Sequence, residues 1–296
     1  MITVRVPATS ANLGAGFDCY GLALSLFNEI DVSLADETTL DVSGEGADTL
    51  PRDGNNLVLR ALDYYFSAIG QPMPALHIST RNVIPVARGL GGSSAAIVSG
   101  LLAANALAGD LLSTDDLLDM SVAIEGHPDN VAPAILGGIV VGVMNGKRLV
   151  TDNLPVPPTL RTVVFVPDFH MSTEQARAIL PREVPRSDVI FNLSRTALFA
   201  AAVVSGKMHL LSEAMRDRLH QPYRTAMFPA MPQIIEAAVG AGALGACLSG
   251  AGSTILALVC DHDQDVAVAM HNAAQRLNVP GRSLLLDITT RGAYVC

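Results

Sequence analysis

Residues 87 to 96 read ARGLGGSSAA, a glycine-rich run that leads into a long apolar segment and contains no lysine. A Walker A loop requires GxxxxGK[ST], and the only two lysines of the chain, Lys147 and Lys207, lie far from this run in the sequence. A GxGxxG loop also fails, because Ser94 stands where the third glycine is needed. The run is therefore neither a P-loop nor the glycine loop of Rossmann folds and protein kinases.

The glycines of this run still let backbone N–H groups approach a ligand closely. Gly89, Gly91 and Gly92 carry no side chain, and a helix that starts near Ser93 would point its positive end at the ligand. These features predict a site for an anion, of which phosphate is the natural example. A loop that needs its glycines only to turn tightly onto a packed helix is the alternative.

Composition excludes several classes of protein. The chain has 296 residues, 50% of them hydrophobic, and a mean hydropathy of +0.38, which is enough for a sizeable core in about two domains. Its formal net charge of −9 would repel nucleic acid. Glycine and serine interrupt the two long uncharged stretches, residues 89–109 and 237–260, and the N-terminus lacks the apolar core of a signal peptide. We therefore expect a cytoplasmic protein without a membrane span, whose four cysteines, lacking any CxxC pair, are reduced thiols.

Hydrophobic patterning predicts an α+β protein, because several strands precede the first helix. The expected strands are residues 2–6, 29–34, 39–44, 75–80, 137–144, 161–166, 253–259 and 283–288. The expected helices are residues 56–69, 93–108, 113–125, 192–219, 232–239 and 264–277. The proline-rich segment NLPVPPTL at 153–160 is the best linker candidate, so we expect domains at 1–153 and 154–296.

Glu125 falls in the last turn of the predicted helix 113–125, where the helix dipole disfavours a carboxylate by several tenths of a kcal/mol. A nearby cation would resolve that conflict. The Ser94 hydroxyl and the Glu125 carboxylate, joined by phosphate oxygens and water, would make a reasonable Mg²⁺ site. A solvated surface glutamate is the alternative.

Three further segments carry more polar residues than a turn requires. GHPDNVAPA, at 126–134, places His127, Asp129 and Asn130 around a proline, although His127 alone is also compatible with a structural role. PATSANLGAGFD, at 7–18, offers Asn12 and Asp18 in a loop with two glycines. CLSGAGST, at 247–254, precedes a predicted strand and would either close a site or form a hairpin.

PATSANLGAGFD, PVARGLGGSSAA and CLSGAGST, in this order and at these separations, resemble the motifs of the GHMP small-molecule kinases over nearly the whole chain. Together with EGHPDNVAP, the first motif looks most like that of the homoserine kinases. The resemblance implies an ATP-binding N-terminal domain like ribosomal protein S5 domain 2, a ferredoxin-like C-terminal domain, and often a homodimer. It also implies transfer of phosphate from ATP to L-homoserine, giving O-phosphohomoserine for threonine biosynthesis.

The resemblance assigns roles to individual residues. The implied nucleotide-binding residues are Asn56, Arg88, Gly89, Leu90, Gly91, Gly92, Ser93 and Ser94, and the implied Mg²⁺ ligands are Ser94 and Glu125. The implied substrate-binding residues are Asn12, Asp18 and Asp129 near the amino group, Arg195 and Arg224 at the carboxylate, and Ser249 and Gly250 in the third motif. His127, Asp129 and Asn130 are the expected catalytic residues, with Asn130 orienting the hydroxyl.

Three departures from the family pattern qualify these assignments. GLGGSS has one glycine more than the usual GLGSS, so the choice of Ser94 over Ser93 rests on counting back from the helix. GAGFD replaces the frequent GPGFD, and SGAGST replaces SGSGPT. Another GHMP kinase, acting on shikimate or mevalonate, and a non-catalytic sensor of a metabolite or nucleotide are the rival functions.

Overall fold

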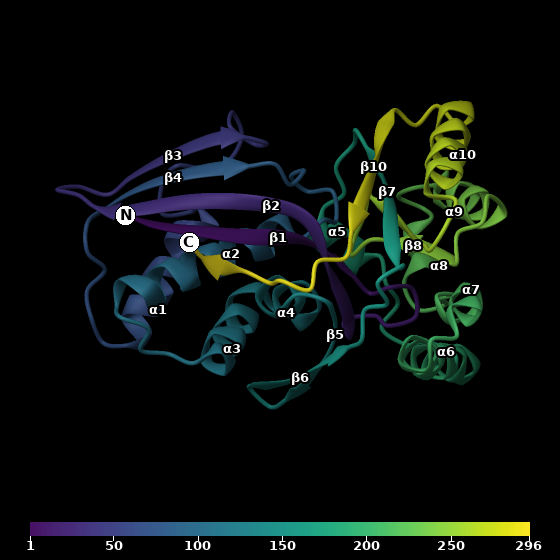
Figure 1. Ribbon diagram of the computed structural model, residues 1–296, viewed down its shortest axis with the longest axis horizontal. Coiled ribbons are helices and arrows are strands. Elements are labelled where there is room, and N and C mark those ends of the chain that lie inside the picture. The colour runs from purple at the N-terminus through teal and green to yellow at the C-terminus, as the bar shows by residue number, and fades with distance from the viewer.

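The computed structural model describes residues 1–296, and its strands form two separate sheets (Figure 1). The first sheet has seven strands, β1 (Ile2–Ala11), β2 (Tyr20–Leu34), β3 (Thr39–Gly44), β4 (Leu76–Asn82), β5 (Ile139–Asn145), β6 (Arg148–Leu154) and β11 (Tyr294–Val295). The second sheet has four strands, β7 (Arg161–Pro167), β8 (Gly245–Leu248), β9 (Ile255–Val259) and β10 (Gly281–Asp287).

Strand β2 organises the first sheet, because it is long enough to take two partners along one edge. Its residues 29–34 pair with β4 and its residues 20–22 pair with β5, while β1 follows its other edge. The pairing of β1 with β2 shifts register between Pro7 and Ala8, where proline has no N–H to donate to the ladder. Beyond this shift the strand leads directly into the loop of the first motif.

Four helices, α1 (Leu57–Ala68), α2 (Gly92–Leu107), α3 (Thr114–Glu125) and α4 (Pro128–Leu136), cover one face of the first sheet (Figure 1). Their ends follow local signals. The Asn56 side chain caps α1 by accepting a hydrogen bond from the backbone N–H of Val58 at 2.9 Å. Ser113 and Asp116 form the predicted capping box of α3. Gly126, at φ 93°, then ends α3 and turns the chain into α4.

The second sheet has the antiparallel order β10-β7-β9-β8, with helices α9 (Met231–Gly240) and α10 (Asp263–Arg276) packed against it. Two β-α-β segments give this order, one from β7 through α9 to β8 and one from β9 through α10 to β10. The strand that comes first along the chain, β7, therefore lies next to the strand that comes last, β10. The expected ferredoxin-like topology is confirmed.

The chain between β7 and α9 forms α5 (Thr173–Ala178), α6 (Arg186–Ser205), α7 (Leu211–Ala214) and α8 (Gln221–Arg224), with a short 3-10 turn at Met208–Leu210. The helical region expected at 192–219 therefore starts earlier and is interrupted, because Gly206 takes a left-handed conformation that ends α6. Helix α6 is long and apolar enough to cross a bilayer by length and composition. One side of it packs into the protein through Asn192, Phe199, Ala202 and Val203.

Every strand and helix expected from the patterning is present, apart from that interruption, but several extend beyond the expected bounds. Strand β2 begins at Tyr20, nine residues before the expected start at residue 29, and β1 continues to Ala11, five residues beyond the expected end. Strands β6, β8 and β11 and helices α4, α5 and α8 were not predicted. Helix α4 was mistaken for a turn because its start combines a proline, Pro128, with the polar residues Asp129 and Asn130. The domain division at 153/154 stays a prediction; the chain crosses back over it when β11 pairs with β1.

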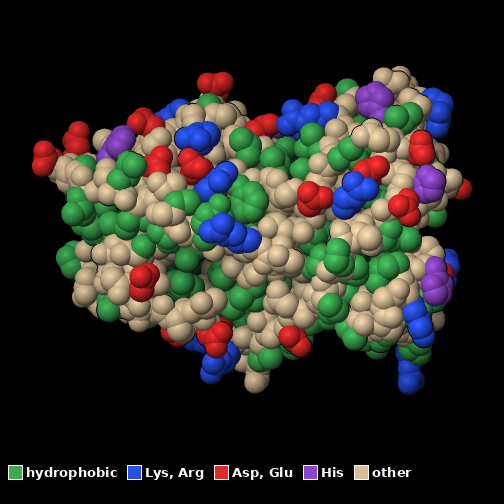
Figure 2. Space-filling model, viewed as in Figure 1, with side chains coloured by type: hydrophobic (Ala, Val, Ile, Leu, Met, Phe, Trp, Pro, Cys, Tyr) green, Lys and Arg blue, Asp and Glu red, His purple; other side chains and the backbone are tan.

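The main apolar core is continuous across the two parts of the chain. Residues of β1 and β2 such as Val4 and Leu22 share one cluster with Val164 of β7, Phe199 of α6 and Leu256 of β9. A second, smaller cluster fills the space between the second sheet and α9 and α10. On the surface, side chains of both charge signs are interspersed with apolar ones (Figure 2). The loops of the sequence motifs meet where the two parts join.

Candidate active site

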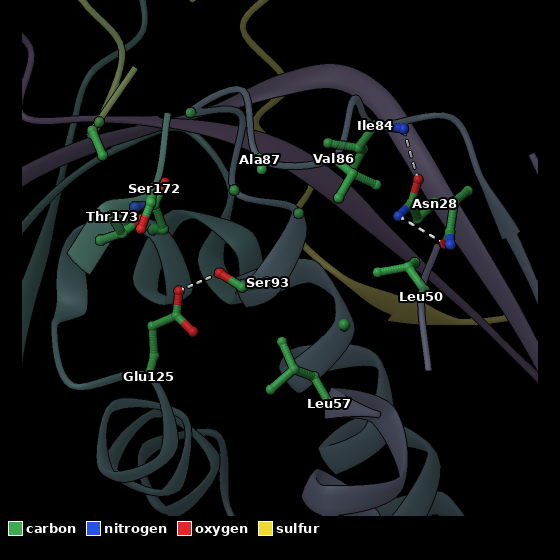
Figure 3. A pocket seen from close by; sticks show the side chains of 18 of the residues that line it. Asn28, Leu50, Leu57, Ile84, Val86, Ala87, Ser93, Glu125, Ser172 and Thr173 are labelled. Atoms are coloured by element: carbon green, nitrogen blue, oxygen red, sulfur yellow. Dashed lines mark hydrogen bonds between the residues drawn. The ribbon is translucent and has the colours of Figure 1, made fainter. Parts of the chain in front are cut away.

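One cavity of about 390 Å³ lies among the loops that carry the sequence motifs (Figure 3). The predicted site residues that line it are Asn12, Asp18, Asn56, Gly89, Gly91, Gly92, Ser93, Glu125, His127, Asp129, Asn130, Arg224 and Gly250. Five elements that carry no predicted residue within their bounds also reach it, namely β2, β3, β4, α1 and α5. The fold thus gathers segments from the whole length of the chain around one space.

The glycine loop is packed so closely that two of its glycines cannot be replaced without displacing neighbours. Gly89 and Gly91 have φ angles of 77° and 70°, in the left-handed region. A Cβ on Gly91 would lie 1.9 Å from Thr9 Oγ1, and one on Gly89 would lie 2.2 Å from the backbone oxygen of Ser249. The glycines are therefore needed to bring the three motif loops together, as well as to expose the backbone.

Helix α2 starts at the cavity with an uncapped N-terminus. Its N-cap residue, Gly91, has no side chain that could accept a hydrogen bond. The backbone N–H groups of Gly92, Ser93 and Ser94 consequently have no acceptor within the protein. Since α2 is 16 residues long, its positive end and these free donors have the features that an anion site requires.

Glu125 accepts hydrogen bonds from both serines at the start of α2. The hydroxyls of Ser93 and Ser94 donate to the same oxygen, Glu125 Oε1, at 2.6 and 2.9 Å. Figure 3 shows Ser93 reaching toward Glu125 from the first turn of α2. Ser93 lines the cavity, whereas Ser94 is fully buried behind it. The hydroxyl that faces the cavity is thus that of Ser93, one residue before the serine preferred from the sequence.

These oxygen donors fit a hard divalent cation such as Mg²⁺, which prefers carboxylate, hydroxyl, phosphate and water oxygens. No group of three His, Cys, Asp or Glu side chains in the structure could hold a metal by itself. A cation beside Glu125 would therefore need phosphate oxygens to complete its shell, as the sequence argument supposed.

His127 and Asp129 form a pair at the start of α4. The His127 Nδ1 lies 2.7 Å from Asp129 Oδ1, and the Asp129 carboxylate is almost completely buried. Burial lowers the pKa of His127, but the hydrogen bond and charge of Asp129, together with the charge of Glu125, outweigh it, so the net pKa is raised. Asp129 thus orients the ring and favours its protonated form.

Asn130 has its side-chain amide held by a buried threonine. Thr9 Oγ1 donates to Asn130 Oδ1 at 2.8 Å, and Thr9 itself is fully buried. With its oxygen occupied, Asn130 has its Nδ2 donor left for a ligand in the cavity that it lines. The sequence pointed to the first-motif loop but not to this role of Thr9.

The loop of the first motif is fixed by Asn12. Its Oδ1 accepts from the backbone N–H of Asp18 at 3.0 Å, and its Nδ2 donates to the backbone oxygen of Gly250 at 3.1 Å. Asn12 and Asp18 both have positive φ angles, 73° and 56°. Such conformations in residues other than glycine cluster at functional sites. Asn12 therefore shapes the loop that presents the Asp18 carboxylate.

Arg177 of α5 is a residue of the site that sequence reasoning missed. It donates two hydrogen bonds to Asp18, at 2.9 and 2.8 Å, and it lines the cavity. The hydrogen bond to Asp18 raises the pKa of Arg177, and the charges of Asp129 and Glu125 raise it further. Nothing in the local sequence distinguishes this arginine from the other surface arginines, because its partner is distant in the chain.

Arg224 of α8 lies at the same end of the cavity and is almost fully buried. The pKa of Arg224 is lowered to about 10, first by burial and then by the neighbouring charge of Arg177, while the charge of Asp18 opposes this change. A pKa of about 10 still leaves the guanidinium charged at neutral pH. Arg177 and Arg224 both lie over the ring of Phe17, with 5.7 and 5.5 Å from their guanidinium carbons to its centroid.

Arg195, the other arginine expected at the carboxylate, does not line the cavity. Its guanidinium lies 3.3 Å from the centroid of the Phe191 ring and pairs with Glu213. The helical periodicity of α6 directs it toward α7, away from the motif loops. The structure brings Arg177 to the cavity and places Arg195 outside it.

Four other predicted residues support the walls rather than line them. Leu90 is buried in the core, and its backbone oxygen accepts from the N–H of Thr9 at 3.1 Å. The Ser249 hydroxyl lies 2.6 Å from the backbone oxygen of Gly89, to which it donates. Arg88 turns away to His170 and the backbone oxygen of Asp168, and Ser94 lies behind Ser93. These residues hold the loops together around the space.

One side of the cavity is mostly apolar. Figure 3 shows Leu50, Leu57, Ile84 and Val86 there, beside Asn28. Asn56 joins this wall while its Oδ1 caps α1 and its Nδ2 donates to the Pro51 backbone oxygen at 2.7 Å. An apolar slot with a few amides suits a nucleoside base, and most of these residues were not singled out from the sequence.

Comparisons with known proteins agree with this geometry. The family model of the GHMP kinases N terminal domain matches residues 56–138, and that of the GHMP kinases C terminal matches residues 199–277. The chain is 42% identical over 296 residues to a homoserine kinase of Desulfitobacterium hafniense and 43% identical over 295 residues to one of Moorella thermoacetica, with 100% of both chains covered in each case. A crystal structure of homoserine kinase from Cytophaga hutchinsonii superposes with a TM-score of 0.90 at 29% identity, covering 100% of this chain and 97% of that one.

The family models that match both parts of the chain show that it belongs to the GHMP kinases, a superfamily of small-molecule kinases. Within that superfamily the chain belongs to the homoserine kinases.

Proposed function

We propose that this chain transfers the γ-phosphoryl group of ATP to the side-chain hydroxyl of L-homoserine, giving O-phospho-L-homoserine for threonine biosynthesis. One observation carries the proposal: a single cavity joins an uncapped helix N-terminus to a cluster of Asp18, Arg177 and Arg224. The first of these features suits the phosphates of a nucleotide, and the second suits a small zwitterion.

The charges of that cluster distinguish an amino acid from the other substrates of the superfamily. An α-amino acid carries an ammonium and a carboxylate on the same carbon, and these groups complement Asp18 and the two arginines. The planar forks of Arg177 and Arg224 favour a carboxylate, as a lysine would not. Mevalonate and shikimate have a carboxylate but no amine, and would leave the Asp18 carboxylate without a cationic ligand.

Asn130 is placed to orient the substrate hydroxyl, since it lines the cavity and its Nδ2 donor has no hydrogen-bond partner in the protein. The hydroxyl oxygen forms a bond to the γ-phosphorus while the bond to the β,γ-bridging oxygen breaks, and the hydroxyl proton passes to a phosphate oxygen or to water. A loose transition state of this kind depends mainly on positioning and charge neutralisation, so it needs no strong base. His127, with Asp129 behind it, flanks the same end of the cavity.

Ser93 and Glu125 would hold Mg²⁺, with Ser94 supporting Glu125 from behind. When bound, the cation neutralises charge on the β- and γ-phosphates. The free N–H groups of Gly92, Ser93 and Ser94 would add fixed positive partial charges at the phosphates.

The experiment that tests the proposal is coupled release of ADP with ATP and Mg²⁺ over a panel of L-homoserine, L-serine, L-threonine, shikimate and mevalonate. A strong preference for L-homoserine is the expected result. Turnover of only shikimate or mevalonate would keep the kinase class but overturn the zwitterion site. ATP binding by calorimetry without turnover of any acceptor would favour a nucleotide sensor instead.

Two further expectations from the family resemblance belong to the same proposal. We expect a homodimer, which sedimentation velocity of the purified protein would test. We also expect a cytoplasmic location and no association with nucleic acid or membranes, which cell fractionation and binding assays would test.

A further inference from the structure

A buried histidine, His220, lies directly behind the substrate end of the cavity. Its side chain is fully inaccessible to solvent and does not line the cavity. The ring stacks on Phe17, with centroids 5.1 Å apart and planes inclined by 22°. Phe17 in turn immediately precedes Asp18 and lines the cavity. His220 thus supports the loop of the first motif from behind.

The two ring nitrogens of His220 face partners of opposite kinds. Nε2 lies 2.8 Å from the backbone oxygen of Gly14, which can only accept a hydrogen bond. Nδ1 lies 3.2 Å from Nη1 of Arg224, which can only donate. These partners require the neutral ring with its proton on Nε2, because a proton on Nδ1 would oppose the arginine donor.

The charged groups around the ring agree with that state. Burial lowers the pKa of His220; the charges of Asp217 and Asp18 raise it, and that of Arg224 lowers it. Asp217 Oδ2 lies 3.5 Å from Nε2, farther than the Gly14 oxygen. The Asp217 carboxylate already accepts from the Asn192 amide and from three backbone N–H groups, those of residues 219, 220 and 221.

Arg224 depends on this nitrogen for its orientation. Its Nε donates to the backbone oxygen of Ala176 at 3.1 Å, and its Nη1 donates to that of Gly250 at 2.9 Å as well as to His220 Nδ1. The remaining nitrogen, Nη2, has no hydrogen-bond partner in the protein. Since Arg224 lines the cavity, Nη2 is the atom available to a ligand.

We propose that His220 is a positioning residue for substrate recognition: its neutral ring, with the proton on Nε2, accepts from Arg224 and holds Nη2 of that arginine toward the substrate carboxylate. The inference rests on the proposed function, since it supposes that Arg224 binds the carboxylate of an amino acid. It adds a residue outside the cavity that sets the preference for acceptors with a carboxylate.

Two variants separate the two contacts of the ring. In His220→Asn the side-chain oxygen takes the place of Nδ1 and can still accept from Arg224, whereas the contact with Gly14 is lost. In His220→Gln the amide extends to the place of Nε2 and can donate to the Gly14 oxygen, whereas the acceptor for Arg224 is lost. The measured quantity is the ratio of kcat/KM for L-homoserine to that for 3-aminopropan-1-ol, which is homoserine without its carboxylate.

The wild-type protein is expected to favour L-homoserine. His220→Gln should lower this ratio about tenfold, through a higher KM for homoserine at unchanged KM for ATP, since one displaced charged contact corresponds to roughly that factor. His220→Asn should keep most of the ratio, which a merely structural role would not predict. A wild-type preference that persists fully in His220→Gln would overturn this inference alone. A wild-type enzyme without preference would overturn the proposed carboxylate site, and this inference with it.

A second test uses the wild-type protein and so does not depend on whether a variant folds. Long-range ¹H–¹⁵N correlation spectra of histidine-labelled protein should show His220 as the neutral tautomer with its proton on Nε2 at pH 7. A protonated ring, or the tautomer with its proton on Nδ1, would overturn the inference whatever the variants do.

Discussion

Arg177 and Asp18 are 159 residues apart in the sequence, yet the guanidinium of Arg177 donates to both oxygens of the Asp18 carboxylate, at 2.9 and 2.8 Å. About one-third of each side chain is exposed to solvent, so the pair lines the cavity and leaves it open to a ligand. It offers an amino acid one partner for each of its two charges.

Replacing Arg177 with glutamine should raise the KM for L-homoserine about thirtyfold, because the lost charged hydrogen bonds correspond to about 2 kcal/mol of binding. The KM for ATP should change little. Arg195→Gln is the matched control, since Arg195 lies outside the cavity against Phe191. Steady-state kinetics of the two variants would contradict this account if Arg195→Gln raised the KM for homoserine and Arg177→Gln did not.

Asn130→Ala should lower kcat about thirtyfold, since removing the amide that orients the hydroxyl costs about 2 kcal/mol of transition-state binding. Thr9→Val, which removes the hydrogen bond that fixes the Asn130 amide, should produce a smaller loss in the same direction. Single-turnover rates at saturating substrates measure both effects. An unchanged rate in Asn130→Ala would refute its role.

Gly91→Ala should abolish tight binding of ATP, because the new Cβ would lie 1.9 Å from Thr9 Oγ1 and push the glycine loop away. Gly109 provides the control: it has a left-handed φ of 86° as well, but a Cβ there would meet no other atom within 4 Å. Gly109→Ala should therefore cost only about 1 kcal/mol of stability and leave binding intact. Calorimetric titration with ATP and Mg²⁺ distinguishes the two; equal affinity in both variants would argue against the loop as the phosphate site.

The raised pKa of His127 makes a prediction about stability and pH. Because the folded protein binds the His127 proton more tightly than the unfolded chain, this group stabilises the fold below its ordinary pKa of 6.5, and the contribution is lost as the pH rises through the higher folded value. The free energy of unfolding of the wild type, minus that of His127→Gln, should therefore fall on going from pH 6 to pH 8. The subtraction removes the opposite contribution of buried His220, whose pKa is lowered. Urea unfolding at matched ionic strength measures this difference in the free energy of unfolding. A difference that rises with pH would contradict the pairing of His127 with Asp129.

The sequence predicted most of the fold because its local signals are consistent with the tertiary structure. The capping box of Ser113 and Asp116 and the stop at Gly126 appear where the pattern placed them. Helix α4 was missed because its first residues, His127 to Asn130, carry the polar and proline signals of a turn. Strands β8 and β11 are too short, at four and two residues, for an alternating pattern to be read.

In the site, the sequence indicated what lies in motifs and missed what depends on distant contacts. Asn12 and Asp18 belong to a dense polar loop and Asn130 to the polar start of α4, and all three line the cavity. Arg177 belongs to a short helix of ordinary composition, and only the folded chain brings it to Asp18. Arg195 lies in a longer helix whose periodicity places it on another face.

The most direct test of the central claim is ³¹P and ¹H NMR of a reaction mixture that contains the protein, ATP, Mg²⁺ and L-homoserine. We predict one new phosphate monoester signal, coupled to the methylene protons next to the former side-chain hydroxyl and growing at the rate at which ADP appears. Release of inorganic phosphate alone, or ATP that stays unconsumed, would contradict the account.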